Sequence, residues 1–380
     1  MAESENTRYY RVTFKPLELY TFGTEMGAAI AGIPNKGKQS YIMTTNLLPD
    51  QTTILGTLRY LALRDNRLLD TGFNYSGRQN ELKACIGPES FRFGAEKELD
   101  FGKIRAVSPL FLWNEKEEGI YIRNPFCNVT EAGYRPMKMV APMQTSNGSI
   151  STPECSTDGY IAKEGFSHGF IGLNSPHTVV RDDDLFTRHV LPGNQITGDD
   201  DDNSFYKREA VSLHQDYAFA VYVQAANGTY GNDSATGEAS WVTTANMGRK
   251  NAPFRVEFTE LDPAIFSARE EELPPVSAYL KAMTESVFKD EPECWYYALS
   301  DLYSATGDKA KEFAILEKKN IRNLETRACE ETGYINKRKK NERIHLIAAG
   351  SVFYAEAPVF GKNVNCQKIG YNIIAKLGGK

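Results

Sequence analysis

Residues 49–63, PDQTTILGTLRYLAL, contain the start of a helix and decide how the rest of the chain is interpreted. Pro49 and Asp50 end any preceding extended segment, and Thr52 or Thr53 is placed to cap the free backbone amides of the helix that follows. Apolar residues recur at the spacing of one helical face, at Ile54, Leu55, Leu58, Leu61 and Ala62. The stretch therefore predicts an amphipathic helix that packs one face on a core.

The other face of this helix contains an unexpected glycine. Thr52, Gly56, Arg59 and Leu63 lie away from the apolar stripe, and a glycine inside a helix costs about 1 kcal/mol relative to alanine. A close neighbour at Gly56 would explain its presence. Two interpretations stay open: a second packed layer, or an RNA backbone or partner subunit lying against the helix start.

Length and composition indicate a water-soluble protein. A chain of 380 residues exceeds the usual size of one core, which predicts two tightly joined domains. No apolar run approaches 18 residues and the chain opens on the charged segment MAESENTRYYR, so we expect a cytoplasmic protein. The six cysteines lie at least 28 residues apart, which excludes a short metal-binding or redox pair.

Charge is unevenly distributed along the chain. The net charge of −5 argues against a general nucleic-acid coat protein, because phosphate binding depends on clustered Lys and Arg. Residues 318–340 nevertheless carry eight basic side chains and three acidic ones. This pattern favours a subunit that contacts RNA locally and proteins elsewhere.

Several segments have the alternation of half-buried strands. They include residues 8–20 and 254–258. Residues 217–225 are predicted as a buried strand, and short turns between strands imply antiparallel pairing. We interpret KACIG (83–87) as a further strand and residues 181–208 as a long hairpin or insertion. Helical periodicity begins after Pro274 and Pro275, includes Trp295 and Leu299, and is expected to continue through a charged helix at 309–331.

Motifs for catalysis or cofactor binding are missing from the sequence. The glycines of residues 23–37 do not have the spacing of a nucleotide-binding loop. The acidic runs 182–184 and 199–202 offer oxygen ligands for Mg²⁺, but such runs are usually solvated turns. Among the five histidines only His345 follows a basic cluster, so it is the candidate for acid–base cleavage of RNA, against the alternative of a solvated or core histidine. We expect no metal and no cofactor.

Three groups of residues combine the features that bind an RNA backbone: amides at a helix start, a glycine that admits phosphate, and polar or basic neighbours. The first lies in the 49–63 stretch, the second in a predicted basic turn, and the third near the end of the chain. They comprise Gln51, Thr52, Thr53, Gly56 and Arg59; Gly248, Arg249 and Lys250; and Gly350, Ser351, Lys368, Gly370 and Asn372. Taken singly, each group is also typical of an ordinary turn.

The chain resembles a known family at these positions. Leu48-Pro49, Thr52-Thr53 and Leu55 to Arg59 are similar to the first-helix signature of the RAMP superfamily of CRISPR effector complexes. Further likeness occurs at Phe205 to Glu209, Gly350 to Phe353 and Ile369 to Asn372. Length and layout most resemble the Cmr-type (type III-B) subunit that caps the 5′ tag of the guide RNA, the crRNA.

The resemblance implies a fold of class α+β. We expect two ferredoxin-like (RRM-like) domains with antiparallel sheets, residues 1–210 and 211–380. A protruding hairpin near 181–208 would elaborate the first domain, and a helical insertion near 274–330 the second. The pairing of two such domains comes from the resemblance, whereas the short turns between strands predict the class.

The resemblance also implies a function and partners. We expect a non-catalytic subunit that holds the 5′ tag of the crRNA and bridges a large polymerase-like signalling subunit to the backbone RAMP subunits, with target RNA contacted indirectly. The alternatives are a RAMP-type metal-independent endoribonuclease that matures crRNA, the equivalent subunit of a type III-A or III-D complex, and a scaffold protein without RNA specificity. Membrane association is not expected.

Overall fold

The structure is a computed structural model of the chain. It describes residues 7–23, 41–69, 77–126, 168–194, 205–231, 240–267, 272–289, 295–303, 313–322, 343–354 and 363–378. Short strands between 128 and 166 and the pair 324–328 with 335–339 are also described. The predicted glycine-rich loop and the acidic run 199–202 lie outside these residues, apart from Gly23.

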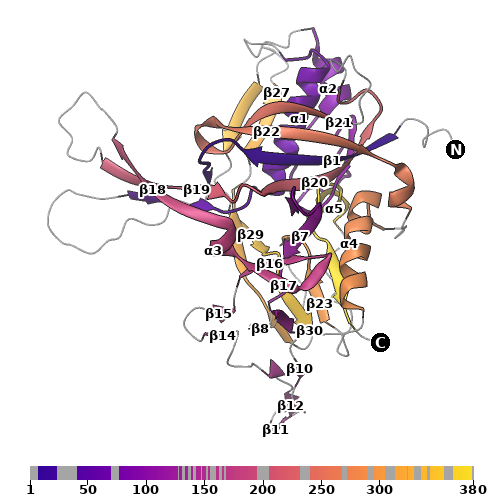
Figure 1. The fold of residues 1–380 in the computed structure, drawn as a ribbon. Helices are drawn as coiled ribbons and strands as arrows, with labels where there is room; N and C mark the ends of the chain where they lie inside the picture. Colours follow the sequence, from indigo (N-terminus) through magenta and orange to yellow (C-terminus); the bar gives the residue numbers. More distant parts are fainter. Residues whose placement is uncertain are drawn as a thin grey trace.

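A nine-stranded antiparallel sheet forms the body of the protein (Figure 1). Strand β1 pairs with β20 on one side and with β22 on the other. The main strand order is β17-β16-β7-β6-β20-β1-β22-β21, and β5 also pairs with β20. The bounds are β1 Thr7–Pro16, β5 Ile104–Val107, β6 Phe111–Asn114, β7 Gly119–Arg123, β16 Gly169–Gly172, β17 Ser175–Arg181, β20 Tyr217–Ala226, β21 Ser240–Met247 and β22 Ala252–Leu261.

The two faces of this sheet border two different cores. Alternation along β1 places Tyr10, Val12 and Phe14 in the core that also receives Phe219 and Phe258. Residues on the opposite face of β20, such as Ala220 and Tyr222, belong to a second core. Because strand side chains alternate between faces, one strand serves both cores.

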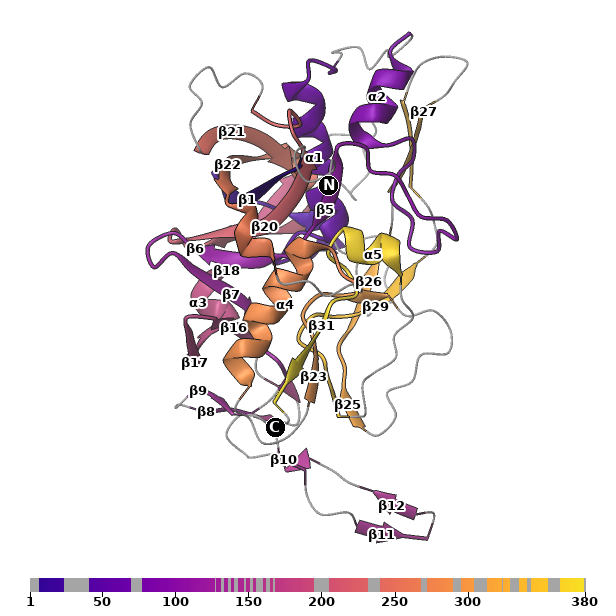
Figure 2. The ribbon, with the colours of Figure 1, turned by 90° about the vertical axis from the view of Figure 1, so that its right-hand side faces the viewer.

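Helices cover the sheet on both sides. Helix α1 (Gln51–Asp65) buries the predicted apolar residues in the first core, where Ile54, Leu58 and Leu61 are fully enclosed. Helix α4 (Pro275–Phe288) packs Val276 and Leu280 into the second core, alongside β23 and β31 (Figure 2). The remaining helical segments are α2 (Gln79–Ile86), α3 (Asp182–Leu185), η2 (Arg249–Asn251), η3 (Pro263–Phe266) and α5 (Val364–Lys368).

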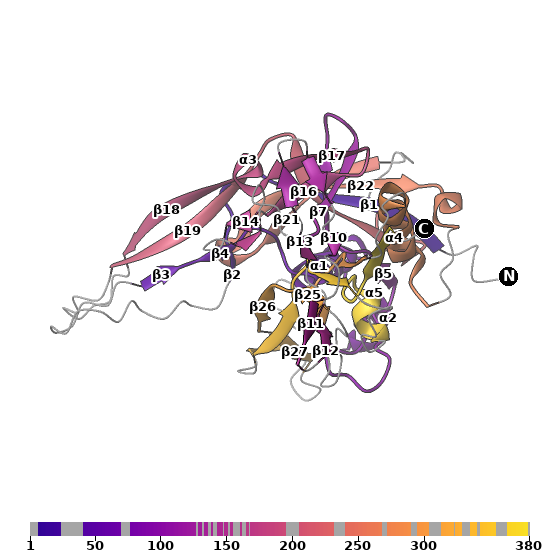
Figure 3. The ribbon, with the colours of Figure 1, turned by 90° about the horizontal axis from the view of Figure 1, so that it is seen from below.

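A long ribbon projects from the body at the position predicted for a hairpin. Strands β18 (Phe186–Asn194) and β19 (Phe205–Leu213) pair antiparallel along their whole length, and β3 (Tyr41–Met43) adds to β19 in parallel. Figure 3 shows the ribbon leaving one side of the molecule. At its root β2 (Phe22–Gly23) pairs with β4 (Thr45–Asn46), and Tyr20 bridges to Val211.

The C-terminal part of the chain forms small sheets beside the second core. One has the order β25-β30-β23-β31 and another the order β24-β29-β26. Their bounds are β23 Trp295–Ala298, β24 Leu302–Tyr303, β25 Phe313–Ile315, β26 Lys318–Ile321, β29 Ile344–Ile347, β30 Val352–Tyr354 and β31 Ile374–Leu377. Further two-stranded ribbons pair β27 (Leu324–Ala328) with β28 (Ile335–Lys339), β8 (Asn128–Thr130) with β9 (Gly133–Arg135), β10 (Lys138–Met139) with β13 (Pro153–Glu154), β11 (Met143–Thr145) with β12 (Gly148–Ile150) and β14 (Tyr160–Ile161) with β15 (Gly165–Phe166).

Three secondary-structure predictions were wrong. The charged helix expected over 309–331 is replaced by β25, β26 and β27, and the helical pattern around Trp295 is the buried strand β23. Residues 83–86, expected as a strand, end helix α2. In each case tertiary pairing or packing outweighed a weak local pattern, as is common for short segments.

The fold class α+β with mostly antiparallel sheets is confirmed. The protruding hairpin is present, and α4 provides a helix inside the predicted 274–330 insertion. The main sheet draws strands from both sides of residue 210, since β1 lies between β20 and β22. The division into domains 1–210 and 211–380 stays a prediction.

Two glycines allow a matched test of this packing. Gly370 has φ of +86°, and a Cβ there would lie 2.2 Å from the Gln51 side-chain nitrogen, whereas a Cβ on Gly56 would meet nothing within 4 Å. Gly370→Ala should therefore lower the free energy of unfolding by about 2 kcal/mol or more. Gly56→Ala should raise it by about 1 kcal/mol. Chemical denaturation of the two variants checks this, and shifts of the same sign would contradict the packing described.

Candidate nucleic-acid interface

Helix α1 begins without a side-chain cap. Asp50 is the N-cap residue, and its backbone carbonyl accepts from the amides of Thr53 at 2.8 Å and Ile54 at 3.1 Å. The Asp50 carboxylate makes no capping hydrogen bond. The prediction that Thr52 or Thr53 caps the helix is therefore wrong, because both residues already lie in its first turn.

The Asp50 carboxylate instead joins an ion-paired group. The ammonium of Lys319 on β26 lies 2.7 Å from Asp50 Oδ1 and 2.7 Å from Asp301 Oδ2. All three side chains are at most 22% exposed. Burial alone would lower the pKa of Lys319, but the carboxylates of Asp301 and Asp50 outweigh it and raise the pKa. Lys319 therefore stays charged and ties the start of α1 to the C-terminal strands.

The first polar side chain of α1 is also bound inside the protein. Gln51 is buried, and its amide nitrogen donates to the carbonyls of Ser108 at 2.8 Å and Gly370 at 3.2 Å. The sequence predicted a close backbone approach at Gly370. The neighbour it admits is the Gln51 side chain, together with the Ser108 carbonyl.

Asn372 and Asp301 extend this group. The Asn372 side chain accepts from the Tyr303 backbone amide at 2.7 Å and donates to the Tyr303 carbonyl at 2.9 Å. The Asn372 amide donates to the Asp301 carbonyl, and Asp301 Oδ1 accepts from Ala349. We call Asp50, Gln51, Asp301, Lys319, Gly370 and Asn372 the junction cluster. It brings the first and third predicted groups together through contacts that sequence spacing could not reveal.

Gly350 and Ser351 are buried next to this cluster. The Gly350 carbonyl accepts from Phe126, and a Cβ at Gly350 would lie 3.1 Å from the Asn124 carbonyl. Ser351 is fully buried, and its hydroxyl accepts from the Glu317 amide at 3.2 Å. Both residues hold the turn between β29 and β30, and an RNA contact by either stays a prediction.

Arg59 and Lys368 are partly exposed and have partners within the chain. Arg59 Nη2 donates to the Glu89 carbonyl at 3.1 Å, and its guanidinium lies 5.4 Å from the centroid of the Phe101 ring. Burial lowers the pKa of Arg59 to about 10, still well above neutral pH. Lys368 pairs with Glu98 at 2.6 Å. Arg59 thus clamps α1 to the segment that follows α2.

The second predicted group lies at the root of the projecting ribbon. Gly248 has φ of +71°, and a Cβ there would lie 2.5 Å from the Thr21 carbonyl, so only glycine fits this approach. The Arg249 amide donates to that same carbonyl at 2.8 Å, and its guanidinium lies beside Gly23. Lys250 is exposed.

Further basic side chains lie along the ribbon, with Arg188 near its root and Lys207 and Arg208 in its outer half. Glu209 on β19 accepts from Arg188 at 3.2 Å and from the Thr45 amide at 3.4 Å, while its carbonyl accepts from Thr21. We call Arg188, Lys207, Arg208, Arg249 and Lys250 the hairpin-root surface; each of them is exposed or partly exposed. Sequence reasoning missed Arg188, although Lys207 and Arg208 lie in a motif that carried the family resemblance.

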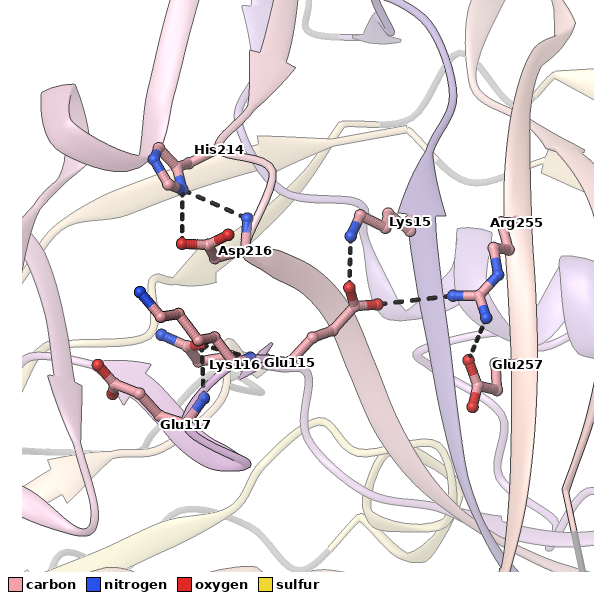
Figure 4. Close-up of polar contacts among 9 residues, drawn as sticks. Lys15, Glu115, Lys116, Glu117, His214, Asp216, Arg255 and Glu257 are labelled. Atoms are coloured by element: carbon pink, nitrogen blue, oxygen red, sulfur yellow. Dashed lines mark hydrogen bonds and ion pairs between the residues drawn. The ribbon is translucent and has the colours of Figure 1, made fainter.

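On the same face as the second core, β1, β22 and the turn after β6 also carry partly exposed polar side chains whose charges neutralise one another. We call this region the open face of the main sheet. Figure 4 shows Glu115 between Lys15 and Arg255, with Arg255 also 2.8 Å from Glu257. Nearby, the Arg11 guanidinium stacks on Trp113 at 3.8 Å, in a hollow of about 290 Å³. Because carboxylates already neutralise the cations here, this face is a poor site for phosphate.

The described residues contain no group of three or more metal-binding side chains. Asp182 of the first acidic run pairs with Arg123 at 2.5 Å. His345 Nδ1 lies 2.6 Å from Asn320 Oδ1 on the paired strand, and His189 Nε2 lies 3.0 Å from the Ser212 hydroxyl. No helix in the described residues is long and apolar enough to span a bilayer.

Replacing Lys319 tests the junction cluster. Lys319→Met should cost roughly 2–4 kcal/mol of folding free energy, because it leaves the Asp50 and Asp301 carboxylates facing each other. Since the pKa of Lys319 is raised in the folded state, its contribution is complete below the unfolded pKa of about 10.4 and falls at higher pH. The stability gap to wild type should therefore be constant from about pH 7 to 9 and shrink above about pH 10.4.

Lys318→Met is the matched control. Lys318 is the exposed neighbour of Lys319 on the same strand, and its replacement should change stability by less than about 0.5 kcal/mol. Equal effects of the two substitutions in urea denaturation would contradict the role given to Lys319.

Comparison with known proteins identifies the family. No curated protein matches the sequence. Residues 35–369 match the family described as CRISPR-associated protein (Cas_Cmr3), a span that covers the hairpin-root surface and Asp50, Gln51, Asp301 and Lys319 of the junction cluster. Membership in this family makes the protein a subunit of a multi-subunit type III-B CRISPR effector complex. The chain belongs to the CRISPR-associated Cas_Cmr3 family.

Proposed function

We propose that this protein is the non-catalytic subunit that holds the 5′ tag of the crRNA in a type III-B complex. The observation that carries the proposal is the hairpin-root surface, where the β18–β19 ribbon and residues 249–250, distant in sequence, supply five exposed or partly exposed basic side chains. Thr21 joins the two segments, because its hydroxyl donates to the Glu209 carbonyl and its own carbonyl accepts from the Arg249 amide. The net charge of the whole chain is −5. A local cationic surface on an acidic protein suits contact with a short stretch of RNA.

The backbone around this surface is held firmly in place. The Thr45 hydroxyl accepts from the Phe22 amide and donates to the Phe22 carbonyl, and the Thr21 carbonyl accepts from the Arg249 amide. The positions from which Arg249 and Lys250 extend are therefore defined before RNA binds, which lowers the entropy cost of binding.

A path links this surface to the start of α1. The Tyr20 hydroxyl donates to the Leu47 carbonyl at 3.0 Å, three residues before Asp50. Thr52, Thr53 and Gly56 are exposed or partly exposed beyond it. An RNA strand that crosses the hairpin root and reaches these residues is the arrangement we propose for the tag. Gln51, Ser351 and Asn372 support this surface from inside.

The bridging role belongs to the same proposal. One protein face would contact the large polymerase-like signalling subunit, and another the first backbone RAMP subunit, with target RNA reached indirectly through the guide. The neutralised polar face of the main sheet supports protein contact better than RNA contact, because its charges are already paired. We propose a cytoplasmic location for the assembled complex.

The double variant Arg249→Glu with Lys250→Glu tests the RNA contact. If both side chains contact phosphates, the assembled complex should lose guide RNA at lower salt, with affinity reduced at least about tenfold. The slope of log affinity against log salt should fall by about 1.4, or about 0.7 for each contact to a single strand. Guide content is measured as RNA per complex across a NaCl titration.

Lys116→Glu provides the control. Lys116 is exposed in the turn between β6 and β7, and its replacement should leave the salt slope unchanged. A double variant with wild-type guide retention and slope would remove the hairpin-root surface from the RNA contact.

The non-catalytic role has its own test. Repeat RNA incubated with the protein in EDTA should remain intact. Cleavage that is lost in His345→Ala or in His189→Ala would instead support the endoribonuclease alternative. His189 is included because it lies on the ribbon beside Arg188, where RNA is expected.

A further inference from the structure

The two outer strands of the nine-stranded sheet differ in how they are protected. Strand β17 contains Pro176 and Arg181 and continues into three aspartates. Proline and charge on an edge strand discourage pairing with another chain. Strand β21 at the other edge, SWVTTANM, contains no charge and no proline over eight residues.

The register shows which backbone groups of β21 point outward. Asn246 lies opposite Pro253, whose carbonyl accepts from the Leu17 amide on the β1 side. Since residues of an antiparallel pair alternate in the direction of their backbone groups, Asn246 points its own groups away from β22. The same alternation applies at Ser240, Val242 and Thr244, and the Thr244 carbonyl indeed accepts from Arg64 Nη1 at 3.0 Å.

The side chains at these positions are exposed as well. Ser240, Thr244 and Asn246 are exposed, and Val242 is 53% exposed. The alternate residues Ala245 and Met247 are buried in the first core, which fixes the register of the strand. The described structure thus presents a fixed edge with β-branched side chains and outward amides.

We propose that β21 is a strand-addition site for an extended segment of another protein subunit of the complex. The segment would pair along residues 240–246 and place an uncharged, β-branched or other apolar side chain beside Val242. The inference deepens the bridging part of the proposed function and does not depend on how RNA is held.

The chemistry of the edge favours a protein segment over RNA. Binding of RNA depends on cations near phosphate, and β21 supplies none. Arg64, whose guanidinium reaches this edge, is already bonded to Asp65 at 3.2 Å and to Thr244. Backbone amides and carbonyls at strand spacing are instead the groups that a peptide strand matches.

A second copy of this chain fits the edge less well. Antiparallel pairing of β21 with itself about Thr243 would set Thr244 against Val242 in both copies. The Thr244 carbonyl already accepts from Arg64. In a pair of identical strands, the Arg64 side chain of each copy would therefore lie where the other strand has to form its backbone hydrogen bonds. A strand from a different subunit meets only one such arginine, and the second lone pair of the Thr244 carbonyl remains available to it.

Three substitutions at Val242 separate the possibilities in the assembled complex. Val242→Pro removes an outward amide that has no partner on β22, and Val242→Lys adds a charge to the edge. Both should reduce retention of one partner subunit at least about tenfold while the guide stays bound to the remaining subunits. Val242→Thr keeps the amide and the β-branch, so it should retain the partner. If Val242→Pro fails to fold, Val242→Lys decides the question.

Amide hydrogen exchange provides the second readout. The amides of Val242, Thr244 and Asn246 should exchange at least about tenfold more slowly in the complex than in the isolated chain. Full retention of all subunits in both Val242→Pro and Val242→Lys, or unchanged exchange, would overturn the proposal. Loss of guide RNA with all protein subunits retained would also overturn it and assign the edge to nucleic acid. Partner loss here with a normal salt slope would leave the RNA proposal unaffected.

Discussion

The ion pairs of Lys319 with Asp50 and Asp301 are the contact on which the arrangement of this protein depends. They fix the first residue before α1 to strand β26 and to the segment after β23. Without the ammonium, two carboxylates would face each other among buried groups, which is strongly unfavourable. Gln51, Gly370 and Asn372 then pack around this contact and complete the junction between the two ends of the chain.

This constraint explains why the proposed RNA-binding surface lies outside the junction cluster. The buried polar groups of Gln51, Ser351 and Asn372 are bonded to the protein itself. The cations proposed to contact RNA lie instead along the β18–β19 ribbon and at residues 249–250, and the root of the ribbon is anchored to the start of α1 through Tyr20 and Leu47. The interior contacts that fix the fold and the surface proposed to bind RNA are thus separate.

Sequence reasoning succeeded where a pattern was long and periodic. The apolar stripe of α1, the buried strand β20 and the ribbon near 181–208 follow directly from the sequence pattern. It failed where charged or short segments were decided by distant partners, as for β26, which the sequence presents as part of a charged helix. Nothing local distinguishes Lys319 from Lys318, because the partners of Lys319 lie far away in the chain. The sequence predicted that another group lies close to the backbone of Gly370. That this group is the Gln51 side chain depends on tertiary packing.

Crosslinking of a guide RNA that carries 4-thiouridine in its 5′ tag, within the assembled complex, tests the central claim most directly. The account predicts that crosslinked peptides of this subunit come from residues 186–213 and 248–251, with additional signal from the first turn of α1. Crosslinks confined to the open face of the main sheet, or found only on other subunits, would contradict it.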